Sequence, residues 1–95
     1  MSQRRAGPVD DYVAKRILER RRELGMTQVE LGVRAGGITF QQVQKYEIGQ
    51  NRVSAGRLYA LAHSLGVPVG YFYAGYGRQE PEAKPVTLVE ALRVF

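Results

Sequence analysis

The sequence predicts an all-α protein, with five helices in one small domain and a further short helix at the C-terminal end. Two observations support this fold class. Apolar residues recur at helical spacing in successive segments, most of them opened by a capping residue and closed by glycine. No segment alternates apolar and polar residues as a half-buried strand would. A chain of 95 residues suffices for one domain with a modest core and a tail.

The composition excludes several classes of function. Without cysteine, the chain has no disulfide framework, thiolate site or zinc ribbon. A lone His63 without Cys, His or acidic companions predicts no metal, and no nucleophile–base pattern suggests an enzyme or a cofactor. No apolar run or signal-peptide pattern indicates a membrane or export, so a cytoplasmic protein is expected. A net charge of +5 favours an anionic partner.

The first helix is expected to begin at Asp10 or Asp11, since acids suit a helix N-terminus. Val13, Ile17 and Leu24 then fall on one face, and glycine at position 25 ends the helix. Residues 1–9 are polar and basic. They are expected to form a mobile arm that either follows DNA or has no role.

Capping residues mark the next three helices. Thr27 and Glu30 form a capping box ahead of a helix over residues 28–35, which a pair of glycines ends. Thr39 caps a helix over residues 40–48, and Ser54 caps a fourth with an apolar stripe up to residue 65. Pro68 suits the first turn of a short fifth helix that ends at residue 73. The domain therefore covers residues 10–77.

Two helices joined by a glycine-containing turn form a helix-turn-helix arrangement, and the second one here is rich in side chains that can read bases. Such a helix lies in the major groove of DNA. Glutamine there can pair with adenine, and Lys45 can reach the acceptors of guanine. Val43 is the one aliphatic residue in mid-helix and should point inward.

The stretch "GMTQVELGVRAGGITFQQVQKYEIGQNRVS", followed by "LYALAHSLGVPVGYFY", resembles the Cro/CI-type helix-turn-helix regulators, also called XRE-like. The resemblance covers residues 12–73. It rests on the Thr-Gln start of the second helix, the aromatic-Glu-x-Gly run at residues 46–49 and "LGVP" after the fourth helix. It implies a five-helix, lambda-repressor-like DNA-binding domain.

The resemblance also implies roles for individual residues. The base-reading positions are Thr39, Phe40, Gln41, Gln44 and Lys45, and Phe40 would meet a thymine methyl group or a sugar edge. The backbone-contacting positions are Gln28, Gln42, Asn51 and Arg52. Arg21 and Glu47 match a structural ion pair between the first and third helices.

Two glycines depart from the family pattern. Gly37 lengthens the turn by one residue, which leaves the register of the recognition helix open by one position. Gly32 stands where the family commonly has alanine, although glycine inside a helix costs about 0.5–1 kcal/mol relative to alanine.

The C-terminal end is predicted to be a linker over residues 78–85 and a helix over residues 86–95. Leu88, Leu92 and Phe95 fall roughly in line on that helix. They either form a dimer contact or fold back on the domain, and the dimer is favoured because an exposed apolar face needs a partner.

The predicted function is a transcriptional regulator, more specifically a repressor, that binds double-stranded DNA as a homodimer at an inverted repeat. One alternative is an antitoxin-type module that neutralises a protein partner and regulates its own operon. Another is a fragment of a longer phage-type repressor with a separate oligomerisation domain.

Overall fold

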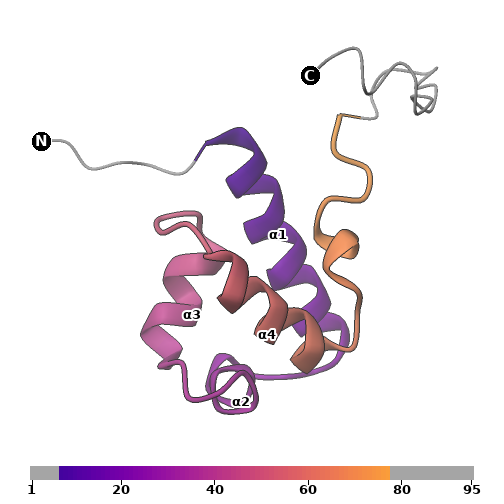
Figure 1. Ribbon diagram of the computed structural model, residues 1–95. Coiled ribbons are helices and arrows are strands. Elements are labelled where there is room, and N and C mark those ends of the chain that lie inside the picture. Colours follow the sequence, from indigo (N-terminus) through magenta and orange to yellow (C-terminus); the bar gives the residue numbers. More distant parts are fainter. Residues whose placement is uncertain (1–6, 78–95) are drawn as a thin grey trace, which may run out of the picture.

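The computed structural model describes residues 7–77. Residues 1–6 of the predicted arm over residues 1–9, and the predicted linker and C-terminal helix, lie outside the described residues, whereas Pro8 and Val9 of that arm belong to a helix. Within them the chain forms four α-helices, one 3-10 helix and no strand, which confirms the all-α class. These elements are α1 (Pro8–Glu23), α2 (Gln28–Arg34), α3 (Phe40–Glu47), α4 (Ala55–Leu65) and η1 (Val69–Phe72). In Figure 1, α1 and α4 lie between α3 on one side and the segment after α4 on the other.

The caps of three helices match the prediction. The Thr27 hydroxyl accepts the Glu30 N–H at 3.0 Å, and the Glu30 carboxylate accepts the Thr27 N–H at 2.8 Å. Thr39 and Ser54 each accept an N–H three residues further on, both at 3.2 Å. Because a capping side chain satisfies an N–H that the helix leaves free, these residues determine where α2, α3 and α4 begin.

Both ends of α1 differ from the prediction. The helix begins at Pro8, two residues before Asp10, because proline suits the first helical position and the Asp10 carboxylate accepts the N–H of Gly7 at 3.0 Å. It ends at Glu23, so Leu24 lies in the turn and its side chain is 43% exposed. The expectation that Leu24 shares a buried face with Val13 and Ile17 was therefore wrong.

The predicted fifth α-helix is a single turn of 3-10 helix. Tyr71 N–H donates to the Pro68 carbonyl at 2.9 Å, and Tyr73 N–H donates to the Gly70 carbonyl at 3.1 Å. Pro68 has extended backbone and precedes the turn instead of lying in it. A segment this short, with glycine inside it, does not sustain an α-helix by itself, and burial of Phe72 holds it in place.

Every element contributes to one core. Its fully buried large side chains are Ile17 from α1, Leu31 from α2, Val43 from α3, Leu61 and Leu65 from α4, and Phe72 from η1. Burying each such side chain stabilises the fold by roughly 1.5–3 kcal/mol. Since one core includes residues of all five elements, α3 packs against the rest of the domain.

Three side chains spaced four residues apart on α1 also hold the end of α4 and the chain that follows it. We call them the α1 clamp. The Tyr12 hydroxyl donates to Ala74 O at 2.6 Å, Arg16 to Tyr71 O at 3.2 and 3.3 Å, and Arg20 Nε to Leu65 O at 3.0 Å. The Arg16 guanidinium also lies over the Tyr71 ring, 4.0 Å from its centre. The clamp fixes the course of residues 65–74 along α1.

The turn between α2 and α3 explains why glycine stands at positions 32 and 37, the two departures from the family pattern. Gly36 and Gly37 have φ values of 98° and 93°, a backbone conformation that residues other than glycine rarely adopt. The N–H groups of Gly37 and Ile38 both donate to the Gly32 carbonyl, at 3.0 and 2.9 Å. A Cβ on Gly32 would lie 2.0 Å from the Ile38 carbonyl oxygen. The path of this turn therefore leaves no room for a side chain at position 32, and both glycines serve the same turn.

Candidate nucleic-acid interface

The burial pattern of α3 determines which of its side chains can meet a ligand. Thr39 is the N-cap, so α3 begins at Phe40 as predicted. Val43, Tyr46 and Glu47 are buried against the rest of the domain. The opposite face of the helix is consequently open to solvent.

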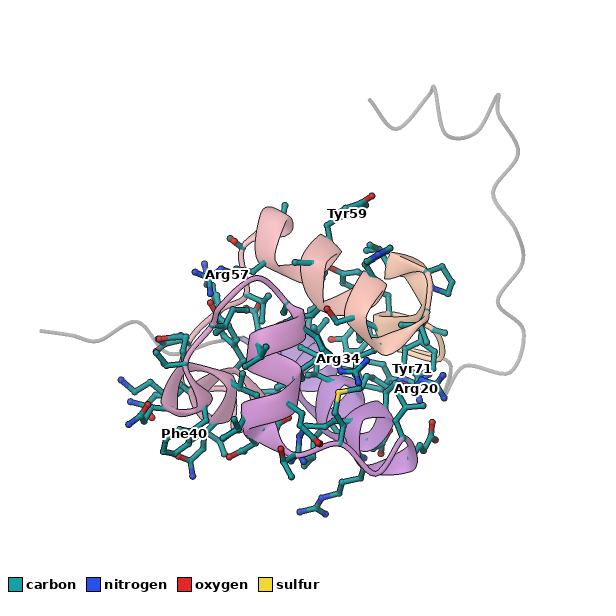
Figure 2. The ribbon with its side chains drawn as sticks, turned by 90° about the horizontal axis from the view of Figure 1, so that it is seen from below. Arg20, Arg34, Phe40, Arg57, Tyr59 and Tyr71 are labelled. Atoms are coloured by element: carbon teal, nitrogen blue, oxygen red, sulfur yellow. The ribbon has the colours of Figure 1, made fainter. Side chains whose placement is uncertain are left out.

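This open face carries the predicted base-reading set. Thr39, Phe40, Gln41, Gln44 and Lys45 are all exposed, whereas the predicted backbone contact Gln42 is half-buried at the edge. Phe40 is 46% exposed at the first turn, and Figure 2 shows it on the side of the domain opposite Arg20 and Tyr71. Amide, ammonium and aromatic groups on one helix face can bind base edges and thymine methyl groups in a major groove.

A buried ion pair holds α3 in place. Arg21 Nε lies 2.6 Å from Glu47 Oε2, and Arg21 Nη2 donates to Glu47 Oε1 at 3.0 Å. The hydrogen bond with Glu47 raises the pKa of Arg21 above its ordinary value, against the opposing effect of burial. The guanidinium therefore stays charged at any ordinary pH. The pair that the family resemblance implied is present, and it joins α1 to α3.

Gln28 completes this brace. Its side-chain amide donates to Glu47 Oε1 at 3.0 Å, which ties the first residue of α2 to the last residue of α3. The side-chain amide of Gln28 is therefore used inside the domain, and its contact with the DNA backbone stays a prediction.

The loop after α3 carries the other predicted backbone contacts, Asn51 and Arg52, and both side chains are exposed. The N–H groups of Gln50 and Asn51 donate to the Lys45 carbonyl at 3.0 and 3.3 Å, which fixes the loop to the end of α3. Arg52 Nε lies 3.2 Å from Asp10 Oδ2. The loop thus lies beside the start of α1 and beside the open face of α3, which we call the recognition face (Figure 1).

Two residues that sequence reasoning missed lie close to this surface. Arg57, in the first turn of α4, is exposed and places Nη1 3.5 Å from the Tyr46 hydroxyl (Figure 2). Ile48, one turn beyond Gln44, is 65% exposed. The position of Arg57 three residues after the Ser54 cap was a usable signal, since it predicts a cation beside a helix N-terminus.

Residues 7–77 hold no side-chain cluster for a metal and no helix that could span a membrane. No three acidic, histidine or cysteine side chains gather there as a metal would need. None of the helices over the same range has the length and apolar character required to cross a membrane.

Comparison with known proteins agrees with this geometry. Residues 17–72 match the family described as Helix-turn-helix. The chain belongs to the Cro/CI-type (XRE) helix-turn-helix family of transcriptional regulators. The match includes α2, α3 and the turn between them, together with the C-terminal part of α1 and all of α4 and η1.

Curated relatives extend the similarity. An uncharacterized transcriptional regulator in the ATPase CF(0) region of Rhodospirillum rubrum is 47% identical over 73 residues, covering 77% of this chain and 67% of its own. The HTH-type regulator y4aM of Sinorhizobium fredii is 54% identical over 69 residues, covering 73% of this chain and 48% of its own. The chain therefore spans about half to two thirds of these relatives. They are named as regulators and not as enzymes, in agreement with the prediction.

Solved structures show the same fold. The restriction-modification controller protein C.AhdI from Aeromonas hydrophila superposes with a TM-score of 0.63 at 25% identity, covering 66% of this chain and 94% of the controller. The P22 c2 repressor, in complex with a synthetic operator, gives a TM-score of 0.61 at 25% identity with the same coverage.

Proposed function

We propose that this protein is a sequence-specific transcriptional regulator that binds double-stranded DNA through α3, as a repressor. The observation that carries the proposal is the solvent face of α3, where the exposed base-reading set lies over a helix locked by the buried pair of Arg21 and Glu47. Rigid positioning matters because base recognition requires side chains held close to the right geometry. The operator-bound P22 c2 repressor supports the same assignment.

We further propose that the protein acts as a homodimer on an inverted repeat. Two-fold symmetry would place the half-site centres about one helical turn of DNA, ~34 Å, apart. The predicted tail contact of Leu88, Leu92 and Phe95 would join the two copies. Such a regulator acts in the cytoplasm, where the DNA is, and needs no cofactor.

The test is a selection from random duplex DNA at moderate salt, with the full chain and with a version that ends at residue 77. An enriched inverted repeat supports the function, and its dependence on the tail supports the tail as the dimer contact. A repeat that needs no tail places the dimer contact elsewhere. Absence of any enriched sequence contradicts the DNA-reading role and directs attention to a protein partner, as in an antitoxin.

Substitutions separate base reading from backbone binding. Gln41→Ala and Lys45→Ala should relax the preference at particular operator positions, by about 1–3 kcal/mol for each good contact. Arg52→Ala should weaken binding to all sequences alike and make it less sensitive to salt. Affinities for a panel of operator variants check this, and equal loss across the panel for Gln41→Ala and Lys45→Ala would disprove their base-reading role.

A further inference from the structure

An acidic side chain lies against one of the proposed DNA-binding residues. Asp10, in the first turn of α1, places Oδ2 3.2 Å from Arg52 Nε and accepts the N–H of Gly7 with the same oxygen at 3.0 Å. The Asp10 side chain is 35% exposed and that of Arg52 is 58% exposed. The carboxylate is therefore fixed by α1, whereas the arginine it meets extends from the loop after α3 into solvent.

The contact between Asp10 and Arg52 differs from the buried pair of Arg21 and Glu47 in how many guanidinium nitrogens it leaves without a partner. Arg21 uses all three guanidinium nitrogens inside the domain, on Glu47 and on the Met26 carbonyl. Arg52 Nε lies near Asp10 as an ion pair without the hydrogen-bond alignment of the Arg21 pair, and the two terminal nitrogens of Arg52 have no hydrogen-bond partner among residues 7–77. A guanidinium that approaches a carboxylate on its Nε side leaves its two terminal nitrogens for a second oxyanion, such as a phosphate.

The loop itself does not depend on Asp10. Its main chain is held by the Lys45 carbonyl, which accepts two N–H groups. The Asp11 carboxylate packs close to Gly49, where a Cβ would lie 2.6 Å from Asp11 Oδ1, and asparagine at position 11 would keep this packing because it has the same shape. Loss of the Asp10 charge should consequently release the Arg52 side chain while the loop stays in place.

The geometry points to Asp10 as a positioning residue that orients Arg52 for a DNA phosphate, an inference that rests on the proposed function. A carboxylate beside a DNA-binding surface repels phosphate by itself. The Asp10 carboxylate is still compatible with DNA binding for two reasons. The N-terminus of α1 offsets part of its negative charge, and the carboxylate keeps the Arg52 side chain oriented before DNA binds. Asp10 thus acts on DNA through Arg52 and not by contact.

The test compares two neighbouring substitutions that remove the same charge in the full chain. Asp10→Asn removes the ion pair but keeps an oxygen for the Gly7 N–H, whereas Asp11→Asn removes a charge that forms no ion pair among the described residues. Affinity is measured on a duplex carrying the selected repeat. Asp11→Asn should tighten binding slightly, and Asp10→Asn should bind about two- to five-fold more weakly than Asp11→Asn, the range of an exposed ion pair.

The same pair of changes in an Arg52→Gln background makes the test specific. There the two variants should bind alike, because Asp10 has nothing left to orient. The Arg52 Nε–H signal of the free protein, followed by NMR, should move in Asp10→Asn and not in Asp11→Asn. Equal affinities of the two single variants, or a difference that survives in Arg52→Gln, would overturn the inference while leaving the proposed function intact. A wild-type protein that selects no duplex would overturn both.

Discussion

At the scale of single residues, Glu47 is the acid on which the position of α3 depends. Its side chain is 2% exposed and accepts three hydrogen bonds, two from Arg21 and one from Gln28. Glu47→Ala leaves the Arg21 charge without its partner in a place where little water can reach it. We expect the free energy of unfolding to fall by about 3–5 kcal/mol, measured by urea denaturation of the full chain.

Glu23→Ala is the matched control. Glu23 also pairs with an arginine, Arg20, at 3.2 Å, but its side chain is 58% exposed. Removing an exposed pair should change the free energy of unfolding by no more than about 1 kcal/mol. Similar losses for the two alanine variants would show that burial of Glu47 is not the cause.

At the scale of elements, the α2–α3 turn predicts an unusual response to alanine. Gly→Ala inside a helix normally stabilises a protein by about 0.4–1 kcal/mol. Gly32→Ala should instead destabilise it by about 1–3 kcal/mol, since its Cβ would collide with the Ile38 carbonyl and the neighbouring backbone must shift. Thermal or urea unfolding measures the change.

Gly56→Ala, in the first turn of α4, serves as the comparison because a Cβ there meets nothing within 4 Å. This variant should be as stable as the wild type or slightly more stable. If Gly32→Ala were as stable as Gly56→Ala, the close approach of the Ile38 carbonyl would not be the reason for glycine at position 32.

At the scale of the whole molecule, Arg20 of the α1 clamp and the Tyr71 that the clamp contacts lie on the side of the domain opposite Phe40 (Figure 2). Arg16→Met keeps much of the side-chain stem but removes the two hydrogen bonds to Tyr71 and the charge over its ring. The amides of Tyr73 and Tyr76 should then exchange with solvent faster, by about five- to ten-fold for a loss near 1 kcal/mol.

Amides within α3 should keep their protection in Arg16→Met, because the buried pair of Arg21 and Glu47 and the core still hold that helix. Lys15→Met controls for the loss of one charge on α1, since Lys15 is exposed and makes no ion pair within residues 7–77. If the amide exchange rates of Tyr73 and Tyr76 were unchanged in Arg16→Met, the α1 clamp would not be what holds this segment.

The local sequence was sufficient to predict the helical class, the caps at Thr27, Thr39 and Ser54, and the outward face of α3. These features depend on groups only a few residues apart, such as a hydroxyl and the N–H three positions later. Family resemblance added the pairing of Arg21 with Glu47, which composition and periodicity do not contain.

Only the tertiary structure decided the rest. The exposure of Leu24, the 3-10 turn before Phe72, the need for glycine at position 32 and the contact of Asp10 with Arg52 all depend on how helices pack and where turns lead. Asp10 and Arg52 lie 42 positions apart in the sequence, and nothing near either residue shows that the other is its neighbour. Local rules determine where helices form and which faces they present, whereas contacts between distant segments arise only once one core holds all the elements together.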